Sequence, residues 1–476
     1  MNSLIKTMFF DPSKYSKLAI ITDKTKFTYK DLLFNIFCLK EYLSKLSIHK
    51  NQTVSIYMND CPEYVFLFWA CIFSGVKPIL INKKMNRANL DYLYSNSNSV
   101  YLISDIDLEY GNRVVVKLDD IRSYLNTKDC TEELSFSNID CLPGDVPSFY
   151  LCTSGSTGNS KIIPHTLDDV LNCIESFQAT STCIVPEDLI FSVSKIPFAY
   201  GFGNSVYLPF YVGATVFICE YDSISQIYKS ICRNNPTVVF GVPTFFNSIL
   251  KLYDNINEIG SKFRMCISCG ETLPNVTFEE WSRRTNNYLV EGMGTTEFLY
   301  IFFINSLHSP KNGSVGTLVP GYSARIIKKD GSEAEINEVG ELYVSGRSCW
   351  NKEVSEISTG DLFYRDADNN YYYCGRTNDL FKINGNWFKS STIENELIRQ
   401  SEINEAMVRV NTTNKTSIEA YIVLADNQEI SDLKLKSRLR KRIPHYGIPD
   451  NFFRVRKIPK GITGKINRGA EIKTSE

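Results

Sequence analysis

The sequence predicts an α/β protein with a large N-terminal domain of packed mixed and parallel sheets with helices, followed by a small C-terminal α+β domain. Three features predict this class. Strand and helix patterns alternate along most of the chain, a smaller and different set follows near the end, and the chain has 476 residues. That length exceeds what one compact core can organise, so two or three domains are expected. We place a boundary near Asn378, which divides the chain into residues 1–377 and 378–476.

Alternating helix and strand patterns begin close to the N-terminus. Thr28 and Asp31 have the spacing of a helix start, and apolar residues follow them at i, i+3 and i+4. Residues 54–58 then favour a strand, residues 63–73 a strongly apolar helix and residues 77–81 the next strand. This order indicates a parallel sheet with helices on its faces.

The rest of the chain supplies further strands and then a change of pattern. Strands are expected again at residues 189–192, 215–218, 238–240 and 264–267. The polar, weakly patterned tract from about residue 105 to 145 is expected to cross the surface. Beyond residue 377 the pattern predicts strands at 381–383, 406–410 and 420–424, and helices at 391–401 and 431–442. About 100 residues are enough for an independent domain.

Charge and cysteine content restrict the partners and the compartment. The chain has 52 basic and 53 acidic residues and a net charge of -1, so neither nucleic acid nor an anionic membrane is indicated as the main partner. The first residues contain one lysine and a short apolar patch at residues 8–10, which fits neither a signal peptide nor a membrane span. Fourteen scattered cysteines then fit reduced thiols, and we expect a cytoplasmic protein.

Two motifs that suggest redox or metal chemistry have simpler explanations. Cys266 and Cys269 match C-x-x-C, but they lie in an apolar run that favours a strand, whereas a redox pair needs an exposed first cysteine at a helix N-terminus. Residues 366–370 begin like a calcium loop but lack the glycine at its sixth position and the glutamate at its twelfth. They favour a tight turn between strands. The four histidines form no plausible zinc motif.

A loop rich in hydroxyls and glycine, residues 153–161, follows an apolar run that favours a buried strand. Backbone N–H groups and hydroxyls at a strand end can surround phosphate oxygens, glycine permits close approach, and Lys161 adds a cation. The spacing of Gly155 and Gly158 to Lys161 excludes a Walker A loop. Taken alone, such a loop is equally typical of a flexible linker.

Four more segments follow this loop in order: residues 291–297, 358–361, 375–379 and 459–465. The series resembles the adenylate-forming superfamily of acyl-CoA synthetases, carrier-loading adenylation domains and luciferases, from about residue 18 to 469. The resemblance implies that ATP activates a carboxylic acid as acyl-AMP, with release of pyrophosphate. A carboxylate is a poor electrophile, and joining it to AMP gives it a phosphate leaving group. Catalysis therefore depends mainly on positioning the reactants and on stabilising charge at the α-phosphate.

The resemblance implies a role for residues of each segment. The loop residues that would hold the β- and γ-phosphates are Thr153, Ser154, Gly155, Ser156, Thr157 and Gly158, with Lys161 nearby. Thr296 would contact the α-phosphate, and Glu297 would bind Mg²⁺, a hard cation suited to one carboxylate plus phosphates. Asp361 would accept both ribose hydroxyls, and Arg376 would support the ribose-phosphate side.

The remaining assignments concern the adenine, the catalytic lysine and the domain pivot. Gly270, Glu271 and Thr272 match the segment that lies against adenine. Lys465 matches the catalytic lysine that bridges the carboxylate and the α-phosphate. In this family the small domain is mobile and rotates between two half-reactions, and Asn378 stands at the pivot, where aspartate or lysine is usual.

Three of these residues have ordinary structural explanations when each is taken alone. Asp361 could be a turn aspartate, Lys465 a surface lysine in a basic tail, and Glu297 an acid at a helix N-terminus. The joint occurrence of all five motifs in order favours the catalytic interpretation.

Residues 196–205 bear on the identity of the acid. Adenylation domains that take α-amino acids usually carry an aspartate here to pair with the ammonium, whereas this segment has no carboxylate. Because an unpaired buried ammonium is costly, an α-amino acid substrate is disfavoured. The segment instead resembles the benzoate-CoA ligase group, as do residues 270–274 and 372–376.

That resemblance implies a pocket for an aryl acid, in which Tyr200 and Gly292 would suit a flat ring. The candidate pocket residues are Phe198, Ala199, Tyr200, Gly292, Tyr300 and Ile301. Tyr300 replaces an expected histidine, and it would either narrow the pocket or hydrogen-bond a ring substituent. Phe198 and Phe202 fit a core position equally well.

The second step needs a thiol acceptor. Gly385 matches the glycine whose missing side chain lets a phosphopantetheine arm reach the adenylate, and CoA and carrier proteins share that arm. Either acceptor would act in trans. The leading interpretation is therefore an aryl-acid–CoA ligase that uses ATP, Mg²⁺ and CoA. The alternatives are a stand-alone enzyme that loads a carrier protein and a non-catalytic nucleotide-binding relative.

Overall fold

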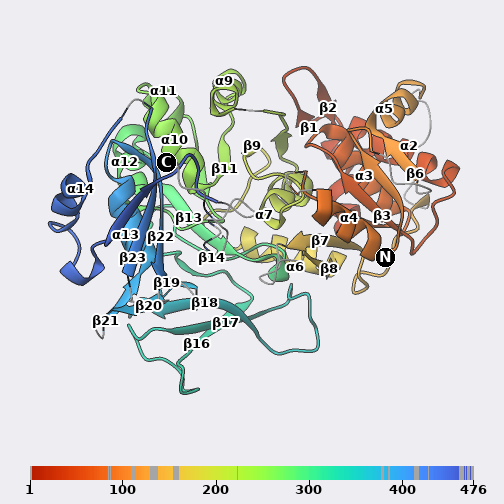
Figure 1. The fold of residues 1–476 in the computed structure, drawn as a ribbon. Helices are drawn as coiled ribbons and strands as arrows, with labels where there is room; N and C mark the ends of the chain where they lie inside the picture. Colours follow the sequence, from red (N-terminus) through yellow and green to blue (C-terminus); the bar gives the residue numbers. More distant parts are fainter. Residues whose placement is uncertain are drawn as a thin grey trace. The chain divides into compact units, whose positions relative to one another are not determined.

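The computed structural model describes residues 3–83, 85, 87–108, 114–128, 138–153, 160–221, 223–376, 380–383, 386–411, 417–426, 428–459, 466, 468 and 472. The chain divides into two compact units (Figure 1). The first comprises Met1–Ser323 and Ser345–Ser355, and the second comprises Ala324–Val344 and Glu356–Glu476. The predicted boundary after residue 377 falls at residues 377–379, outside the described residues, and stays a prediction.

The first unit contains a six-stranded sheet in the order β6-β5-β3-β4-β7-β8. Its strands are β3 (Thr53–Tyr57), β4 (Lys77–Leu80), β5 (Ser99–Ser104), β6 (Val114–Lys117), β7 (Phe149–Thr153) and β8 (Lys161–His165). Neighbouring strands are parallel except for the antiparallel pair β7 and β8. The predicted parallel sheet is therefore confirmed.

A nine-stranded sheet, in the order β15-β14-β13-β12-β11-β9-β10-β1-β2, completes the β structure of this unit. Its strands are β1 (Leu18–Ile21), β2 (Lys26–Thr28), β9 (Leu189–Ser192), β10 (Thr215–Phe217), β11 (Val238–Gly241), β12 (Met265–Ser268), β13 (Leu289–Gly294), β14 (Ile301–Ile304) and β15 (Thr317–Leu318). The six strands from β13 to β1 run parallel, and the edge strands β14, β15 and β2 are antiparallel.

The described helices of the first unit include the two that the sequence predicted, after the Thr28–Asp31 start and at residues 63–73. They are α1 (Ser3–Phe9), α2 (Tyr29–Lys45), α3 (Pro62–Phe73), α4 (Arg87–Asn96), α5 (Leu118–Asn126), α6 (Leu167–Gln178), α7 (Ala199–Phe202), α8 (Leu208–Val212), α9 (Ile224–Asn234), α10 (Pro243–Leu252), α11 (Ile256–Gly260) and α12 (Asn275–Thr285). Thr28 and Asp31 cap α2 reciprocally, with Asp31 N–H donating to Thr28 Oγ1 at 3.1 Å and Thr28 N–H donating to Asp31 Oδ2 at 2.8 Å.

The tract from residue 105 to 145 is more regular than its sequence indicates, because it contains β6 and α5. The sequence did not indicate these two elements, although most side chains of α5 are exposed or half-buried, as expected of a surface tract. Helix α5 carries Asp119 and Asp120 in its first turn and buries only Leu118 and Ile121. So few apolar positions leave a weak periodic signal in the sequence.

Strands of the nine-stranded sheet are buried on both faces, as parallel strands usually are. In β11, Val238 and Phe240 join the core shared with the six-stranded sheet, whereas Val239 joins a second core with helices α9 to α12. Cys266 and Cys269 are both buried, and burial raises the pKa of the Cys266 thiol well above its ordinary value. The structural interpretation of this C-x-x-C motif is confirmed.

The described residues of the second unit form three sheets. An antiparallel sheet has the order β16-β17-β18-β19, a hairpin pairs β20 with β21, and a third sheet has the order β22-β23-β24. The bounds are β16 (Tyr322–Ile327), β17 (Gly340–Gly346), β18 (Ile357–Arg365), β19 (Tyr371–Arg376), β20 (Leu380–Ile383), β21 (Asn386–Lys389), β22 (Ile403–Asn411), β23 (Ser417–Leu424) and β24 (Asn451–Arg454), with α13 (Ser390–Ile398) and α14 (Asp432–Leu439).

Packing in this unit centres on α13, α14 and the β22-β23-β24 sheet, whose apolar side chains form one core. The tight turn predicted at residues 366–370 is confirmed, because Asp366 Oδ1 accepts the N–H groups of Asp368 at 3.0 Å and Asn370 at 2.9 Å.

Across the described residues of both units, no group of three or more His, Cys, Asp or Glu could hold a metal ion. None of the described helices is long and apolar enough to cross a membrane.

Candidate active site

The predicted phosphate loop begins and ends on two paired strands. Thr153 is the last residue of β7 and Lys161 the first of β8, and the two are partners in the antiparallel register. Lys161 is exposed and Thr153 half-buried. The pairing holds the two ends of the loop together, while Ser154, Gly155, Ser156, Thr157 and Gly158 lie outside the described residues.

Thr296 and Glu297 lie in a short 3₁₀ turn, Thr296–Phe298, directly after β13. Both side chains are half-buried. The turn ends at Leu299, which is fully buried and has a φ of 65°, in the left-handed region that is unfavourable for leucine. This backbone reversal leads into Tyr300 and β14, so a single turn carries the candidate α-phosphate and magnesium ligands together with a candidate pocket residue.

Tyr200 and Tyr300 lie close together, with ring centroids 6.3 Å apart. Tyr200 Oη donates to the carbonyl of Ile267 at 3.0 Å. Tyr300 is only 2% exposed, and its hydroxyl donates to Asn204 Oδ1 at 2.5 Å. Both phenolic protons are therefore used by protein acceptors.

Asn204 continues this polar chain into the core. Its amide nitrogen donates to Ser192 Oγ at 3.2 Å, and the Ser192 hydroxyl donates to the carbonyl of Ser194 at 3.0 Å. Sequence reasoning did not single out Asn204, although it is an amide in an apolar helical segment. A buried amide needs hydrogen-bond partners, so its position in an apolar segment could have indicated that Asn204 binds another polar group.

The four remaining pocket candidates and the neighbouring Phe202 differ in how deeply they are buried. Gly292 and Ile301 lie on neighbouring strands, and a Cβ at Gly292 would lie 3.4 Å from Ile301 Cδ1. Ala199 and Phe198 are half-buried at the start of α7. Phe202, by contrast, is fully buried, and its ring lies 4.9 Å from that of Phe68 and 5.1 Å from that of Phe149. Phe202 is a core residue.

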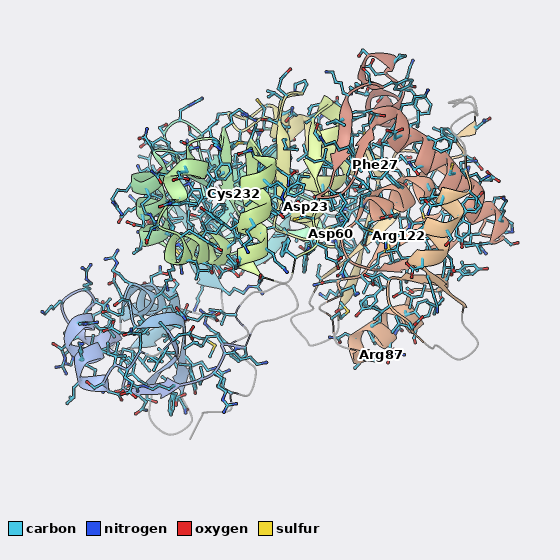
Figure 2. All side chains as sticks on the ribbon, turned by 90° about the horizontal axis from the view of Figure 1, so that it is seen from above. Asp23, Phe27, Asp60, Arg87, Arg122 and Cys232 are labelled. Atoms are coloured by element: carbon cyan, nitrogen blue, oxygen red, sulfur yellow. The ribbon has the colours of Figure 1, made fainter. Side chains whose placement is uncertain are left out.

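A carboxylate that the sequence analysis missed, Asp60, anchors the segment leading into α7. Asp60, labelled in Figure 2, accepts the N–H of Ile196 at 3.1 Å. Its side chain is 9% exposed and lies 3.9 Å from Lys195 Nζ. Burial raises its pKa, and the Lys195 charge acts in the opposite direction. Nothing near residue 60 in sequence indicated this contact, because it joins segments 136 positions apart.

The predicted adenine segment follows β12. Gly270 has a φ of 96°, a conformation that favours glycine. Directly after Glu271 and Thr272, the N–H of Leu273 donates to Glu291 Oε1 at 3.0 Å. Glu291 is 5% exposed, and burial raises its pKa to about 8. At neutral pH its carboxyl group is therefore mostly protonated, and it ties the adenine segment to β13.

Asp361 and Arg376 are brought together in the second unit. They are partners in the antiparallel register of β18 and β19, and Arg376 Nε lies 3.5 Å from Asp361 Oδ1. The Asp361 side chain is 9% exposed and that of Arg376 is 52% exposed. The Asp361 N–H donates to Thr359 Oγ1 at 3.2 Å, just after Gly360, which has a φ of 69°. The arrangement presents a carboxylate beside a guanidinium.

Three single-residue assignments fall outside the described residues. These are the pivot Asn378, the tunnel glycine Gly385 and the catalytic lysine Lys465. Their roles stay predictions.

Comparisons with known proteins agree with this picture over nearly the whole chain. The model of the AMP-binding enzyme family matches residues 12–351, and that of the AMP-binding enzyme C-terminal domain matches residues 392–465. A 4-hydroxybenzoate–CoA/benzoate–CoA ligase of Rhodopseudomonas palustris is 28% identical, over 95% of this chain and 90% of the relative. An anthranilate–CoA ligase of Pseudomonas aeruginosa is 27% identical, over 87% and 85% respectively.

Solved structures support the architecture. The crystal structure of a benzoate CoA ligase from Burkholderia xenovorans superposes with a TM-score of 0.85 at 24% identity, covering 98% of this chain and 99% of that one. The predicted α/β class, with a large N-terminal domain and a small C-terminal domain, is confirmed.

Proposed function

The chain belongs to the AMP-binding enzyme family, and from that premise we propose that it is an ATP-dependent ligase joining an aryl carboxylic acid to CoA through an acyl-AMP intermediate. One observation carries the proposal: five residues that the motifs place at the reacting groups are present, in the expected order, in a chain that aligns over 95% of its length with an aryl-acid–CoA ligase. The retained residues are Thr296, Glu297, Asp361, Arg376 and Lys465.

In the first half-reaction, the residues of the chain bind and orient two anions, ATP and the carboxylate. Asp361 accepts the two ribose hydroxyls, and the neighbouring Arg376 supports the ribose-phosphate side. Thr296 donates its hydroxyl to the α-phosphate. Gly270, Glu271 and Thr272 lie against the adenine, in a segment tied to β13 through Leu273 and Glu291.

Magnesium fits the donor set of the Thr296–Phe298 turn. Glu297 offers one half-buried carboxylate, and Mg²⁺ typically binds one or two carboxylates together with substrate phosphates. The bound ion would neutralise phosphate charge. The loop residues from Thr153 to Lys161 would hold the β- and γ-phosphates, and Lys465 would bridge the acid carboxylate and the α-phosphate.

The surroundings of Tyr200 and Tyr300 support an aryl acid. Both hydroxyls donate to protein acceptors, so the two side chains meet a neighbour through their apolar rings. The Tyr200 ring is half-buried and lies beside the buried Tyr300 ring, and such a ring suits a flat substrate. This arrangement favours the first of the two roles considered for Tyr300, narrowing the pocket. Asp60 does not supply a free partner for an ammonium group, because it binds the Ile196 N–H and lies near Lys195.

The second half-reaction transfers the acyl group to a thiol with release of AMP. CoA is the preferred acceptor because the compared relatives are CoA ligases. Gly385 would admit the phosphopantetheine arm, and Asn378 would serve as the pivot. A carrier protein in trans is the alternative acceptor.

The described cysteines are free thiols, which supports a cytoplasmic location.

Pyrophosphate–ATP exchange with the purified protein tests the proposal. Benzoates should support exchange, whereas cinnamates, fatty acids and amino acids should support much less. Preference for an aliphatic or amino acid would contradict the aryl assignment, and no exchange with any acid would favour the non-catalytic alternative. Thioester formation with CoA, compared with transfer to purified carrier proteins, decides the acceptor.

Lys465→Ala separates the two half-reactions. It should abolish adenylate formation and largely spare thioester formation from supplied aryl-adenylate, because only the first step needs the lysine charge at the α-phosphate. Pyrophosphate exchange and single-turnover thioester formation measure the two steps. Equal loss of both would contradict the role of Lys465.

A further inference from the structure

The segment Ser345–Ser355, called the strap below, is grouped with the first unit although the chain on both sides of it belongs to the second. Two of its residues bind backbone carbonyls of the turn that carries Thr296 and Glu297. The N–H of Trp350 donates to the Glu297 carbonyl at 2.9 Å, and Ser348 Oγ donates to the Phe298 carbonyl at 2.8 Å. The strap therefore holds this turn from a position about 50 residues further along the chain.

Ser348 is fully buried and takes part in a directional chain of hydrogen bonds. Its hydroxyl also lies 2.7 Å from Tyr322 Oη. Because the single proton of Ser348 is donated to Phe298, the Tyr322 hydroxyl must donate to Ser348 Oγ. The Cys173 thiol gives a weaker second donor to the Phe298 carbonyl, at 3.5 Å.

The turn needs such support because its backbone is unfavourable by itself. Leu299 adopts a left-handed conformation that an L-residue with a side chain normally avoids. Such a conformation persists only where surrounding contacts enforce it, and it is found mainly at functional sites. The strap contacts involve the two residues immediately before Leu299.

The far side of the strap is anchored on α6. Lys352 Nζ lies 2.5 Å from Asp169 Oδ1 and also donates to the Arg347 carbonyl at 2.8 Å. The Asp169 side chain is 1% exposed, and it also accepts the N–H of Thr166 in the capping box of α6. A buried carboxylate of this kind requires a charged partner, and Lys352 supplies it.

We propose that Ser348 and Lys352 are positioning residues that hold the Thr296–Phe298 turn in the geometry required for Mg²⁺ and α-phosphate binding. The proposal rests on the function proposed above for Thr296 and Glu297. Neither positioning residue touches substrate in this scheme, since Ser348 acts through the Phe298 carbonyl and Lys352 through Asp169. Tyr300 is held separately by Asn204, so aryl-acid binding should depend less on the strap.

The test compares Ser348→Ala and Lys352→Met with two matched variants. Ser345→Ala removes a strap hydroxyl that pairs with Ser323 at 2.6 Å instead of with the turn. Lys352→Arg keeps the charge and the donor toward Asp169. Amide hydrogen exchange at residues 298–300 is the first measurement, because it reports the turn whether or not the enzyme is active.

Exchange at these amides should accelerate about tenfold in Ser348→Ala, the size expected for one lost hydrogen bond. It should accelerate in Lys352→Met as well, and stay unchanged in Ser345→Ala and Lys352→Arg. Unchanged amide exchange in both Ser348→Ala and Lys352→Met would overturn the positioning role. This result would stand independently of any activity.

The second measurement is pyrophosphate exchange as a function of Mg²⁺ concentration, with benzoate as the acid. Ser348→Ala and Lys352→Met should raise the half-saturating Mg²⁺ concentration by about tenfold and lower kcat, with the benzoate KM changed much less. Lys352→Arg should have the same half-saturating Mg²⁺ concentration as the unaltered protein. Faster amide exchange with an unaltered Mg²⁺ dependence would overturn the link to Glu297. If the unaltered protein showed no pyrophosphate–ATP exchange with any acid, the proposed function itself would be overturned.

Discussion

The Asp361–Arg376 pair and the Thr296–Tyr300 turn place candidate site residues by different physical means. Asp361 and Arg376 are register partners at one end of the five residue pairs that join β18 and β19, and Arg376 Nε lies 3.5 Å from Asp361 Oδ1. The turn has a left-handed leucine and depends on Ser348, Trp350 and Asn204. A residue placed by strand register should tolerate changes elsewhere in the fold. A turn held by distant side chains should respond to changes outside its own motif.

The largest effect is expected at the register-placed carboxylate, from Asp361→Asn. The substitution keeps the strand pairing but removes the charge that would accept two ribose hydroxyls. Loss of two charge-assisted hydrogen bonds should lower kcat/KM for ATP in pyrophosphate exchange by roughly 10²–10⁴-fold. The thermal midpoint should change little, because the backbone register remains.

Asp368→Asn is the matched control, since it removes one carboxylate from an exposed position in the neighbouring turn. It should leave ATP kinetics unaltered. A parallel fall in activity and thermal midpoint for Asp361→Asn would indicate a structural role for this carboxylate instead.

Gly203→Ala tests how tightly the turn-held residues are packed. An added Cβ would lie 2.3 Å from Tyr300 Cε2 and 2.8 Å from the Tyr207 hydroxyl oxygen. The Tyr300 ring must then shift, at a cost of about 1–3 kcal/mol in stability. The urea midpoint should fall, and benzoate activation should decline more than ATP binding.

A double-mutant cycle identifies the group that Gly203→Ala displaces. In a Tyr300→Ala background the same glycine substitution should cost much less, because the ring it meets is gone. An equal cost in both backgrounds would show that Tyr300 is not the obstacle.

A third effect, on stability alone, is a pH dependence from Glu291, which ties the predicted adenine segment to β13. Its folded-state pKa, about 8, lies above the ordinary value of 4.5, so the folded protein retains a proton that the unfolded chain has lost. This contribution to stability is complete below about pH 4.5 and is lost as pH rises toward 8. Glu291→Gln, which cannot ionise and still accepts the Leu273 N–H, should remove that slope.

Urea midpoints of Glu291→Gln and the unaltered protein, compared from pH 5 to about 8.5, measure the difference. The advantage of the variant should grow with pH. Glu187→Gln, at an exposed position, controls for the loss of one carboxylate. A constant difference across the range would show that Glu291 ionises normally in the folded protein.

Sequence patterns predicted those parts of the fold that depend on local periodicity. The capping pair Thr28–Asp31, the apolar helix α3 and four strands of the nine-stranded sheet, β9 to β12, were recognisable, because each needs only neighbouring residues. Helix α5 was not, because two buried apolar residues in a charged helix produce almost no periodic signal. The antiparallel pairing of Asp361 with Arg376 was open to prediction from a strand–turn–strand sequence.

Family membership and the motif residues were determined by the sequence alone, because motif order and spacing are properties of the chain itself. The tertiary structure decided which partners hold those residues: Asn204 for Tyr300, Ser348 for the Phe298 carbonyl, Glu291 for the adenine segment and Asp60 for the entry to α7. None of these four was given a role by the sequence, although Glu291 lies in the motif at 291–297 and Asn204 in the segment 196–205. Their contacts join segments between 18 and 136 residues apart, and side-chain packing over such separations leaves no repeating pattern in the sequence.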